Sequence, residues 1–237
     1  MNKKILSQEA LKLIACITML IDHFGAAIVI ELPVAHMADL YYACRIIGRI
    51  AFPIYGFLLA EGMRHTRNTG KYILRLAVGI LLAELPFDFL FEGGFTWADQ
   101  SVMVTLTLGA VMLLCMQKTE RKLLKLLLIL PFAILADLAK SDYGAGGIVM
   151  IAVFALLDQP ILQTIAVFLV NWQMLPSEGV IIFGVLIIIQ LLATLAMIPI
   201  ALYDGRKLTH SRAIQWGFYL CYPVHLLILW LILRTIR

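Results

Sequence analysis

Charge is what this sequence has little of. Only 14% of its 237 residues are Asp, Glu, Lys or Arg, whereas soluble domains average about 25%. Hydrophobic residues make up 62% of the chain, and the mean hydropathy is +0.94. A soluble core of this size does not need so many uninterrupted apolar segments. The composition therefore excludes a soluble globular fold and indicates a helical protein that crosses a membrane several times.

Linkers, repeats and nucleotide-binding motifs are also missing. No Ser-, Gly- or Pro-rich linker and no low-complexity tract divides the chain, so we expect a single integral membrane domain over residues 1–237. The sequence has no Walker motif, no dinucleotide fingerprint, no nucleophile elbow and no metal-ligand spacing, so no metal is expected. The cysteines are scattered through apolar segments, which predicts small buried side chains; they are Cys16, Cys44, Cys115 and Cys221.

The net charge of +4 is confined to short loops, which argues against nucleic acid as a partner. Lys and Arg gather at Lys3/Lys4, in loop 64–71, in the run 118–125 and at Arg206/Lys207/Arg212. The intervening loops 31–41 and 92–100 carry acidic residues but no Lys or Arg. By the positive-inside rule, the basic loops and the N-terminus face the cytoplasm, and the C-terminus lies on the opposite side. We therefore expect a multi-pass protein of the cytoplasmic (inner) membrane, held by an uncleaved first helix.

The apolar runs predict an all-α, polytopic transmembrane bundle of about nine helices, some of them short or broken. Pro53 is expected to kink the second helix beside Arg49, and Asp158-Gln159-Pro160 separates two short helices. The predicted helices are 11–30, 42–63, 72–91, 101–117, 123–139, 145–157, 161–173, 179–202 and 213–234.

Asp22 and His23 stand side by side in the first apolar run, Leu11 to Ile30, which is 20 residues long. A carboxylate near the bilayer centre costs several kcal/mol, so it is kept mainly where it has a partner or a function. At about 1.5 Å per residue, both residues lie roughly 16–18 Å from the inner face. The same count places other ionisable side chains at about 18–21 Å: Arg49, Glu84, Asp137 and His225. Such a layer is typical either of structural ion pairs or of a reactive or proton-conducting site.

Helical spacing separates the roles of the two neighbours, because consecutive residues point about 100° apart. Asp22 shares its stripe with the small residues Ala15, Thr18 and Gly25, which allow a second helix to approach closely. Arg49 is the expected partner of Asp22, with Arg45 one turn away on the same face. His23 then faces elsewhere, which favours a catalytic or proton-handling role over simple packing.

Six blocks carry a resemblance over nearly the whole chain: LKLIACITMLIDHFGA, RIIGRIAFPIYGFLLAEGMRHTRN, YILRL, ELPFDFLF, SDYG and FYLCYPVHLLIL. In combination they are similar to the TraX family of integral membrane proteins. That family is named for the enzyme that acetylates the N-terminus of F-type conjugative pilin. It is grouped with membrane acyltransferases that use a buried histidine and an acyl-CoA donor. By this resemblance, His23 corresponds to that histidine, with Asp22 beside it. The following block supplies Arg45, Arg49, Glu61, Arg64 and His65.

The resemblance implies transfer of an acetyl group from acetyl-CoA to an amine or hydroxyl acceptor: a peptide N-terminus, a glycan or a lipid. His23 would act as general base, and Asp22 with Arg49 would fix the first helix. Glu84 or His225 would orient His23 or steady the developing charge. The donor would be held by the basic residues Arg45, Arg64, His65, Arg67 and Lys71, although positive-inside sorting also accounts for loop 64–71.

Two alternatives remain open: a small proton-coupled transporter, and a non-catalytic membrane scaffold. A transporter often contains paired broken helices related by an internal repeat, and this sequence shows no such pair. A scaffold would not need histidines matched in depth.

Overall fold

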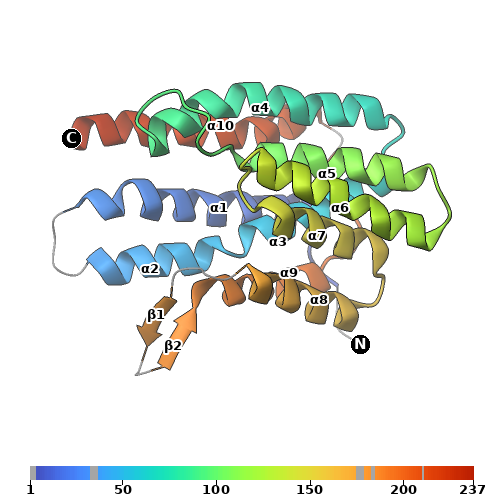
Figure 1. Cartoon of the computed structure of the whole chain (residues 1–237). Helices are drawn as coiled ribbons and strands as arrows, with labels where there is room; N and C mark the ends of the chain where they lie inside the picture. Colours follow the sequence, from blue (N-terminus) through green and yellow to red (C-terminus); the bar gives the residue numbers. More distant parts are fainter. Residues whose placement is uncertain (1–3, 33–36, 175–178, 183–184, 210) are drawn as a thin grey trace. The chain divides into compact units, whose positions relative to one another are not determined.

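The computed structural model describes residues 4–32, 37–174, 179–182, 185–209 and 211–237, most of which are helical (Figure 1). The chain forms two compact units, one from residues 1–55 with 167–237 and the other from residues 56–166. Helices α3 and α8 each begin in one unit and end in the other. Helices dominate both units, which confirms the all-α class.

The first unit is organised around its first helix, which packs against both α2 and α10. Different sides of α1 therefore meet different helices. The elements of this unit are α1 (Gln8–Ala27), the 3₁₀ turn η1 (Val29–Glu31), α2 (Met37–Gly48), the start of α3 (Ala51–His65), the end of α8 (Pro160–Gln173), strands β1 (Gly179–Ile182) and β2 (Val185–Ile188), the 3₁₀ segment η2 (Ile189–Ala196), α9 (Met197–Ala201) and α10 (Arg212–Ile236).

Small residues bring α1 and α2 close together. A β-carbon on Gly25 would overlap the side chain of Cys44, and one on Gly48 would overlap the carboxylate of Asp22. Gly25 belongs to the small-residue stripe that the sequence predicts. The close approach places Asp22 against α2.

Helices α1 and α10 run in the same direction. At their starting ends, Gln8 N donates to Arg206 O (2.9 Å), and Leu208 N donates to a carboxylate oxygen of Glu9 (2.9 Å). At their far ends, Arg237 Nη2 lies 2.5 Å from Glu31 Oε1. Figure 1 shows the C-terminus beside the far end of α1. His23 and His225 each lie about 20 Å along their own helix, which brings them to a common level.

The second unit consists of the rest of α3, the start of α8 and four helices between them. Its core contains fully buried side chains of α5 and α7, including Met112, Ile148 and Phe154. The four helices are α4 (Thr69–Phe91), α5 (Val102–Gln117), α6 (Lys122–Leu138) and α7 (Gly144–Leu156). Helix α5 contacts α4, α6 and α7, so it is the central helix of this unit.

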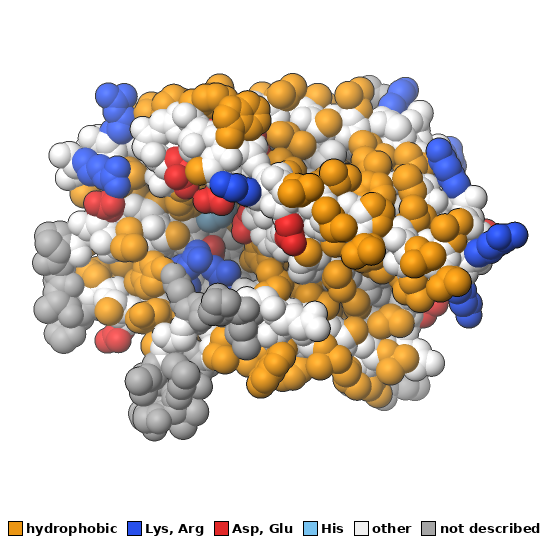
Figure 2. Space-filling view, viewed as in Figure 1, with side chains coloured by type: hydrophobic (Ala, Val, Ile, Leu, Met, Phe, Trp, Pro, Cys, Tyr) orange, Lys and Arg blue, Asp and Glu red, His pale blue; other side chains and the backbone are white. Residues whose placement is uncertain are grey.

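The basic loops of the second unit lie at one of its ends. Gln117 Nε2 donates to Met63 O (2.9 Å), which joins the end of α5 to the end of α3 and so brings loops 64–71 and 118–125 together. Figure 2 shows Lys and Arg side chains gathered at the end where the α5–α6 connection lies. At the other end, Gln100 pairs with the α6–α7 turn through Lys140 O and Asp142 N. Apart from Lys140 at that other end, this distribution is the pattern that the positive-inside interpretation requires, and the side that faces the cytoplasm stays a prediction.

Two predicted helices differ from the structure. The single helix expected over 42–63 is divided at Arg49–Ile50 into α2 and α3. Pro53 lies in the first turn of α3, where its missing N–H has no intrahelical partner to lose, so it begins a helix instead of kinking one. The helix expected over 179–202 is wrong. The described part of that segment forms the antiparallel hairpin β1–β2, then η2 and α9, and its Val and Ile residues favour strands.

Three helical segments are long and apolar enough to cross a membrane, among the residues that the structure describes: Gln8–Glu31, Met37–His65 and Ala213–Ile236. Shorter apolar helices accompany them at Val102–Gln117, Gly144–Leu156 and Ile189–Ala201. Hydrophobic side chains also cover much of the surface in Figure 2, as expected for helices that face lipid. The chain is therefore a multi-pass membrane protein.

Candidate active site

Two imidazole rings meet inside the first unit. His23 Nδ1 on α1 lies 2.7 Å from His225 Nε2 on α10, and the ring centroids are 5.0 Å apart at an interplanar angle of 21°. The ring of Tyr222 packs against both, with centroid distances of 5.8 Å to His23 and 5.5 Å to His225. The second ring nitrogen of His225, Nδ1, lies 2.7 Å from the carbonyl oxygen of Cys221. His225 is buried, with 6% of its surface exposed.

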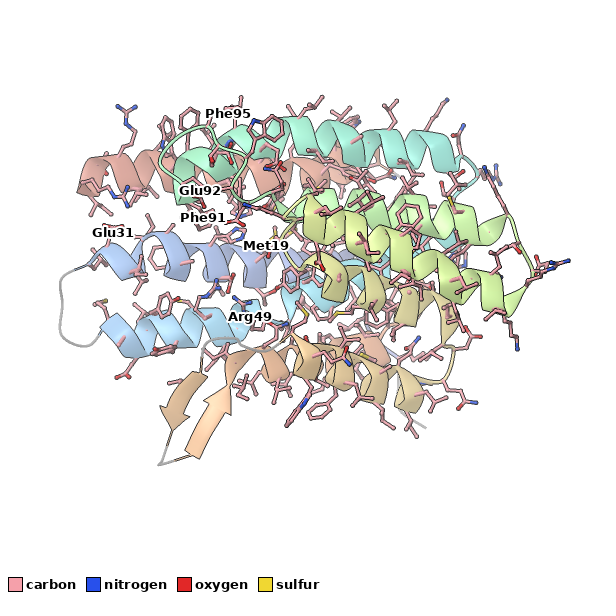
Figure 3. The ribbon with its side chains drawn as sticks, in the orientation of Figure 1. Met19, Glu31, Arg49, Phe91, Glu92 and Phe95 are labelled. Carbon is pink, nitrogen blue, oxygen red and sulfur yellow. The ribbon has the colours of Figure 1, made fainter. Side chains whose placement is uncertain are left out.

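Asp22 turns away from this pair and meets α2, as the helical spacing predicts. Arg45 Nη1 donates to Asp22 Oδ2 at 2.6 Å, whereas Arg49 Nη2 lies 3.6 Å from Asp22 Oδ1. The three side chains are only 16–18% exposed. Both arginines lie near the acid, but the closer partner is Arg45 and not the expected Arg49. Figure 3 places Arg49 just beyond the end of α2, where the chain turns into α3.

Two buried amides extend this polar layer and were missed from the sequence. Arg49 Nη1 donates to Gln190 Oε1 (3.3 Å), and Gln190 Nε2 donates to Asn171 Oδ1 (2.8 Å). Gln190 and Asn171 are 3% and 0% exposed. Both lie in largely apolar runs, and such amides commonly form hydrogen bonds between membrane helices. That signal was available but was not used.

Glu84, the other acid expected near the reaction besides Asp22, belongs to the second unit, on α4. It accepts hydrogen bonds from Ser101, with Ser101 Oγ at 2.6 Å and Ser101 N at 3.2 Å from Glu84 Oε1. Ser101 precedes α5, so Glu84 satisfies polar groups at the start of that helix. Asp137 acts similarly: it lies in the last turn of α6 and accepts from Ala145 N (2.6 Å) in the first turn of α7. A catalytic role for Glu84 stays a prediction.

The residues expected to hold the donor differ in their contacts. Arg64 Nη2 donates to the carbonyl oxygens of Phe154 (2.8 Å) and Ala155 (2.9 Å), so its guanidinium caps the end of α7. His65 Nδ1 lies 3.0 Å from Glu61 O within α3. The side chains of Arg67 and Lys71 are exposed to solvent. Arg45, by contrast, contacts Asp22, and donor binding by this set stays a prediction.

No group of three or more His, Cys, Asp or Glu side chains is placed to hold a metal ion within the described ranges. The polar groups between the helices of the first unit include the histidine pair, the Asp22–Arg45–Arg49 cluster and the amides of Gln190 and Asn171. The histidines contact each other between α1 and α10, whereas Asp22 and Arg45 contact each other between α1 and α2. Such an arrangement can hold a proton and can place positive charge beside an imidazole.

Comparison with known proteins identifies the family of this chain. The model of the TraX protein family matches residues 7–233. The probable fimbrial assembly protein FimC, serogroup H1, of Dichelobacter nodosus is 28% identical over 232 residues, which cover 92% of both chains. No solved structure matches. Because the family model covers nearly the whole chain, the protein belongs to the TraX family.

Proposed function

We propose that this protein is a membrane-embedded acyltransferase, with His23 as the general base. The observation that supports this most is the part-buried contact between His23 and His225 at 2.7 Å, between two helices long and apolar enough to cross a membrane. Structural ion pairing does not require two imidazoles at one level. A base whose ordinary pKa is near 6.5 suits proton abstraction at neutral pH and typically contributes about 10²–10⁴-fold to the rate.

In the reaction, His23 takes a proton from the amine or hydroxyl of the acceptor. The freed lone pair attacks the thioester carbonyl, and a new N–C or O–C bond forms as the C–S bond breaks. The imidazolium of His23 then returns its proton to the leaving thiolate, so the base is restored. The guanidinium groups of Arg45 and Arg49 place positive charge beside the histidine, where negative charge develops on the carbonyl oxygen.

The donor is proposed to be acetyl-CoA, entering from the cytoplasmic side. Its phosphates would meet Arg67 and Lys71, with His65 and Arg64 at the same loop. The pantetheine arm would reach inward toward a histidine that lies about 16–18 Å from the inner face by residue count. This proposal requires the N-terminus and loop 64–71 to face the cytoplasm of an inner-membrane protein.

The family name supports acetyl transfer as the reaction and pilin-like chains as one class of acceptor. The Dichelobacter nodosus relative is named as a probable fimbrial assembly protein, which agrees with a peptide acceptor. A peptide N-terminus is therefore the first acceptor to test, with glycan and lipid acceptors as alternatives.

The decisive experiment measures acyl transfer from acetyl-CoA by the purified protein in lipid nanodiscs. His23→Ala should lower kcat by about 10²–10⁴-fold while donor binding is retained. Ile17→Ala is the control, because this residue lies on the same helix and is 49% exposed. Near-normal transfer by His23→Ala would exclude His23 as the base. Proton flux into vesicles without any transfer would instead favour the transporter alternative.

Donor binding is tested separately at the exposed basic loop. Arg67→Ala should raise the KM for acetyl-CoA several-fold at low salt with little change in kcat, and added salt should reduce the difference. Lys118→Ala is the matched control, because it removes the same charge from the neighbouring loop. Equal KM changes in the two variants would point to a general surface charge effect and would overturn specific donor binding by Arg67.

A further inference from the structure

The hydrogen bonds of His225 determine where its proton lies. Its Nδ1 is 2.7 Å from the backbone carbonyl oxygen of Cys221, and a carbonyl oxygen only accepts. Nδ1 of His225 must therefore carry a hydrogen. A neutral imidazole carries one N–H, so Nε2 of neutral His225 holds a lone pair and accepts.

The same argument gives the position of the hydrogen on His23. Its Nδ1 lies 2.7 Å from the accepting Nε2 of His225, so Nδ1 of His23 must donate. Neutral His23 is then the Nδ1–H tautomer, and its lone pair is on Nε2. We infer that His225 is a positioning residue: it selects the tautomer of His23 and makes Nε2 the basic atom.

The surroundings hold this arrangement in place. Tyr222 packs against both rings, and the ion pair of Glu31 with Arg237 joins the far ends of α1 and α10. Because the acceptor for His225 Nδ1 is a backbone carbonyl one helical turn away, it cannot rotate out of reach as a side chain can. The chain of contacts from Cys221 O through His225 to His23 is therefore set by the packing of α10.

The hydrogen bond between His23 and His225 would also stabilise the protonated base during the reaction. This part of the inference rests on the proposed function. When Nε2 of His23 takes the proton of the acceptor, Nδ1–H becomes part of an imidazolium. Its hydrogen bond to His225 then becomes charge-assisted, and such bonds are about twice as strong as neutral ones. His225 thus stabilises the protonated base without touching the substrate.

The test combines nitrogen NMR with kinetics on the full-length protein labelled with ¹⁵N-histidine in nanodiscs. The signals of His23 are assigned by their loss in His23→Ala. In the wild type, His23 should show a single tautomer with the hydrogen on Nδ1. In His225→Leu, the acceptor for His23 Nδ1–H is lost. His23 should then populate both neutral tautomers, with a large fraction carrying the hydrogen on Nε2. In parallel, kcat should fall about 10–100-fold, as is typical when the residue that orients a histidine is removed, with donor KM unchanged.

His225→Gln keeps an amide oxygen within reach of the former Nε2 position, so it should recover the Nδ1–H tautomer and part of kcat. The inference is overturned if wild-type His23 carries its hydrogen on Nε2, or if the tautomer is unchanged in His225→Leu, even when activity falls. The NMR result does not depend on acyl transfer, so the two proposals can fail separately. If the tautomer of His23 shifts as expected but the protein has no acyltransferase activity, the proposed function is wrong and the positioning role of His225 still holds.

Discussion

The two units place their ionisable side chains in different ways. In the first unit, they contact one another between helices: Arg45 with Asp22, and His23 with His225. In the second unit, Glu84, Asp137 and Arg64 contact polar groups at helix ends, and Arg64 also pairs with Glu61 within α3. Glu84 accepts from Ser101 at the start of α5, Asp137 accepts from the start of α7, and Arg64 donates to carbonyls at the end of α7.

This difference separates structural from functional polar groups. Helix ends leave backbone N–H and C=O groups without intrahelical partners, and in a membrane protein these must be satisfied internally. A charged side chain at a helix end is therefore explained by the fold alone. Two imidazoles in contact between mid-helix positions satisfy no backbone end, so they require another explanation. The comparison directs the search for chemistry to the first unit.

The largest effect on stability is expected at the ion pair of the first unit. Asp22→Asn should destabilise the fold by about 3–5 kcal/mol, because the guanidinium of Arg45 is left buried without its closest acid. Adding Arg45→Gln should recover part of the loss, and reversible unfolding in mixed detergent measures both. The same double-mutant cycle with Arg49→Gln is the comparison. The contact of Arg49 with Asp22 is longer, so the coupling energy between these two residues should be smaller. Additive losses for Asp22 and Arg45 would show that the pair does not interact.

An intermediate effect is expected from a pair of glycines. Gly48→Ala should destabilise by about 1–3 kcal/mol and reduce transfer, because its β-carbon would overlap Asp22 and push α1 from α2. Gly56→Ala is the matched change in the other unit. There the new β-carbon would lie 3.5 Å from Ile151, an ordinary contact, so stability should stay the same or rise. Thermal unfolding of both variants tests this, and equal losses would contradict the close approach at Gly48.

The smallest effect is expected at the helix-end acid of the second unit. Glu84→Gln keeps an acceptor for Ser101, so we expect a loss of about 1 kcal/mol and an almost unchanged kcat. Ser101→Ala is the partner variant and should lower the free energy of unfolding by a similar amount. The double variant should lose little more stability than either single variant. A collapse of kcat in Glu84→Gln with stability retained would instead support the catalytic role that the sequence suggested.

Most of the helices could be predicted from the sequence, because apolar length and loop charge report directly on a membrane environment. The exceptions have local causes. A proline three residues into α3 begins a helix, and the β-branched run after Gly179 forms a hairpin. Neither outcome follows from hydropathy alone, since both segments are as apolar as their helical neighbours.

The sequence singled out Asp22, His23 and His225, but the contacts that they make were only partly predictable. Residue spacing showed that Asp22 and His23 face different helices, and the count of residues put His225 at the level of His23. Spacing favoured Arg49 as the partner of Asp22, whereas Arg45 makes the closer contact. The two arginines lie one turn apart, and the choice depends on how closely α1 and α2 approach. The hydrogen bonds of Gln190 and Asn171 depend on packing between segments distant in the chain.

By itself, the sequence determined the membrane environment, the helical class, the family and the presence of costly ionisable residues inside apolar helices. These follow from composition and from short-range order along the chain. Only the tertiary structure decided that α1 and α10 run side by side in the same direction, which turns two separate histidines into one hydrogen-bonded pair. The physical reason is distance along the chain: their pairing depends on the packing of helices separated by about two hundred residues, and no local pattern encodes that contact.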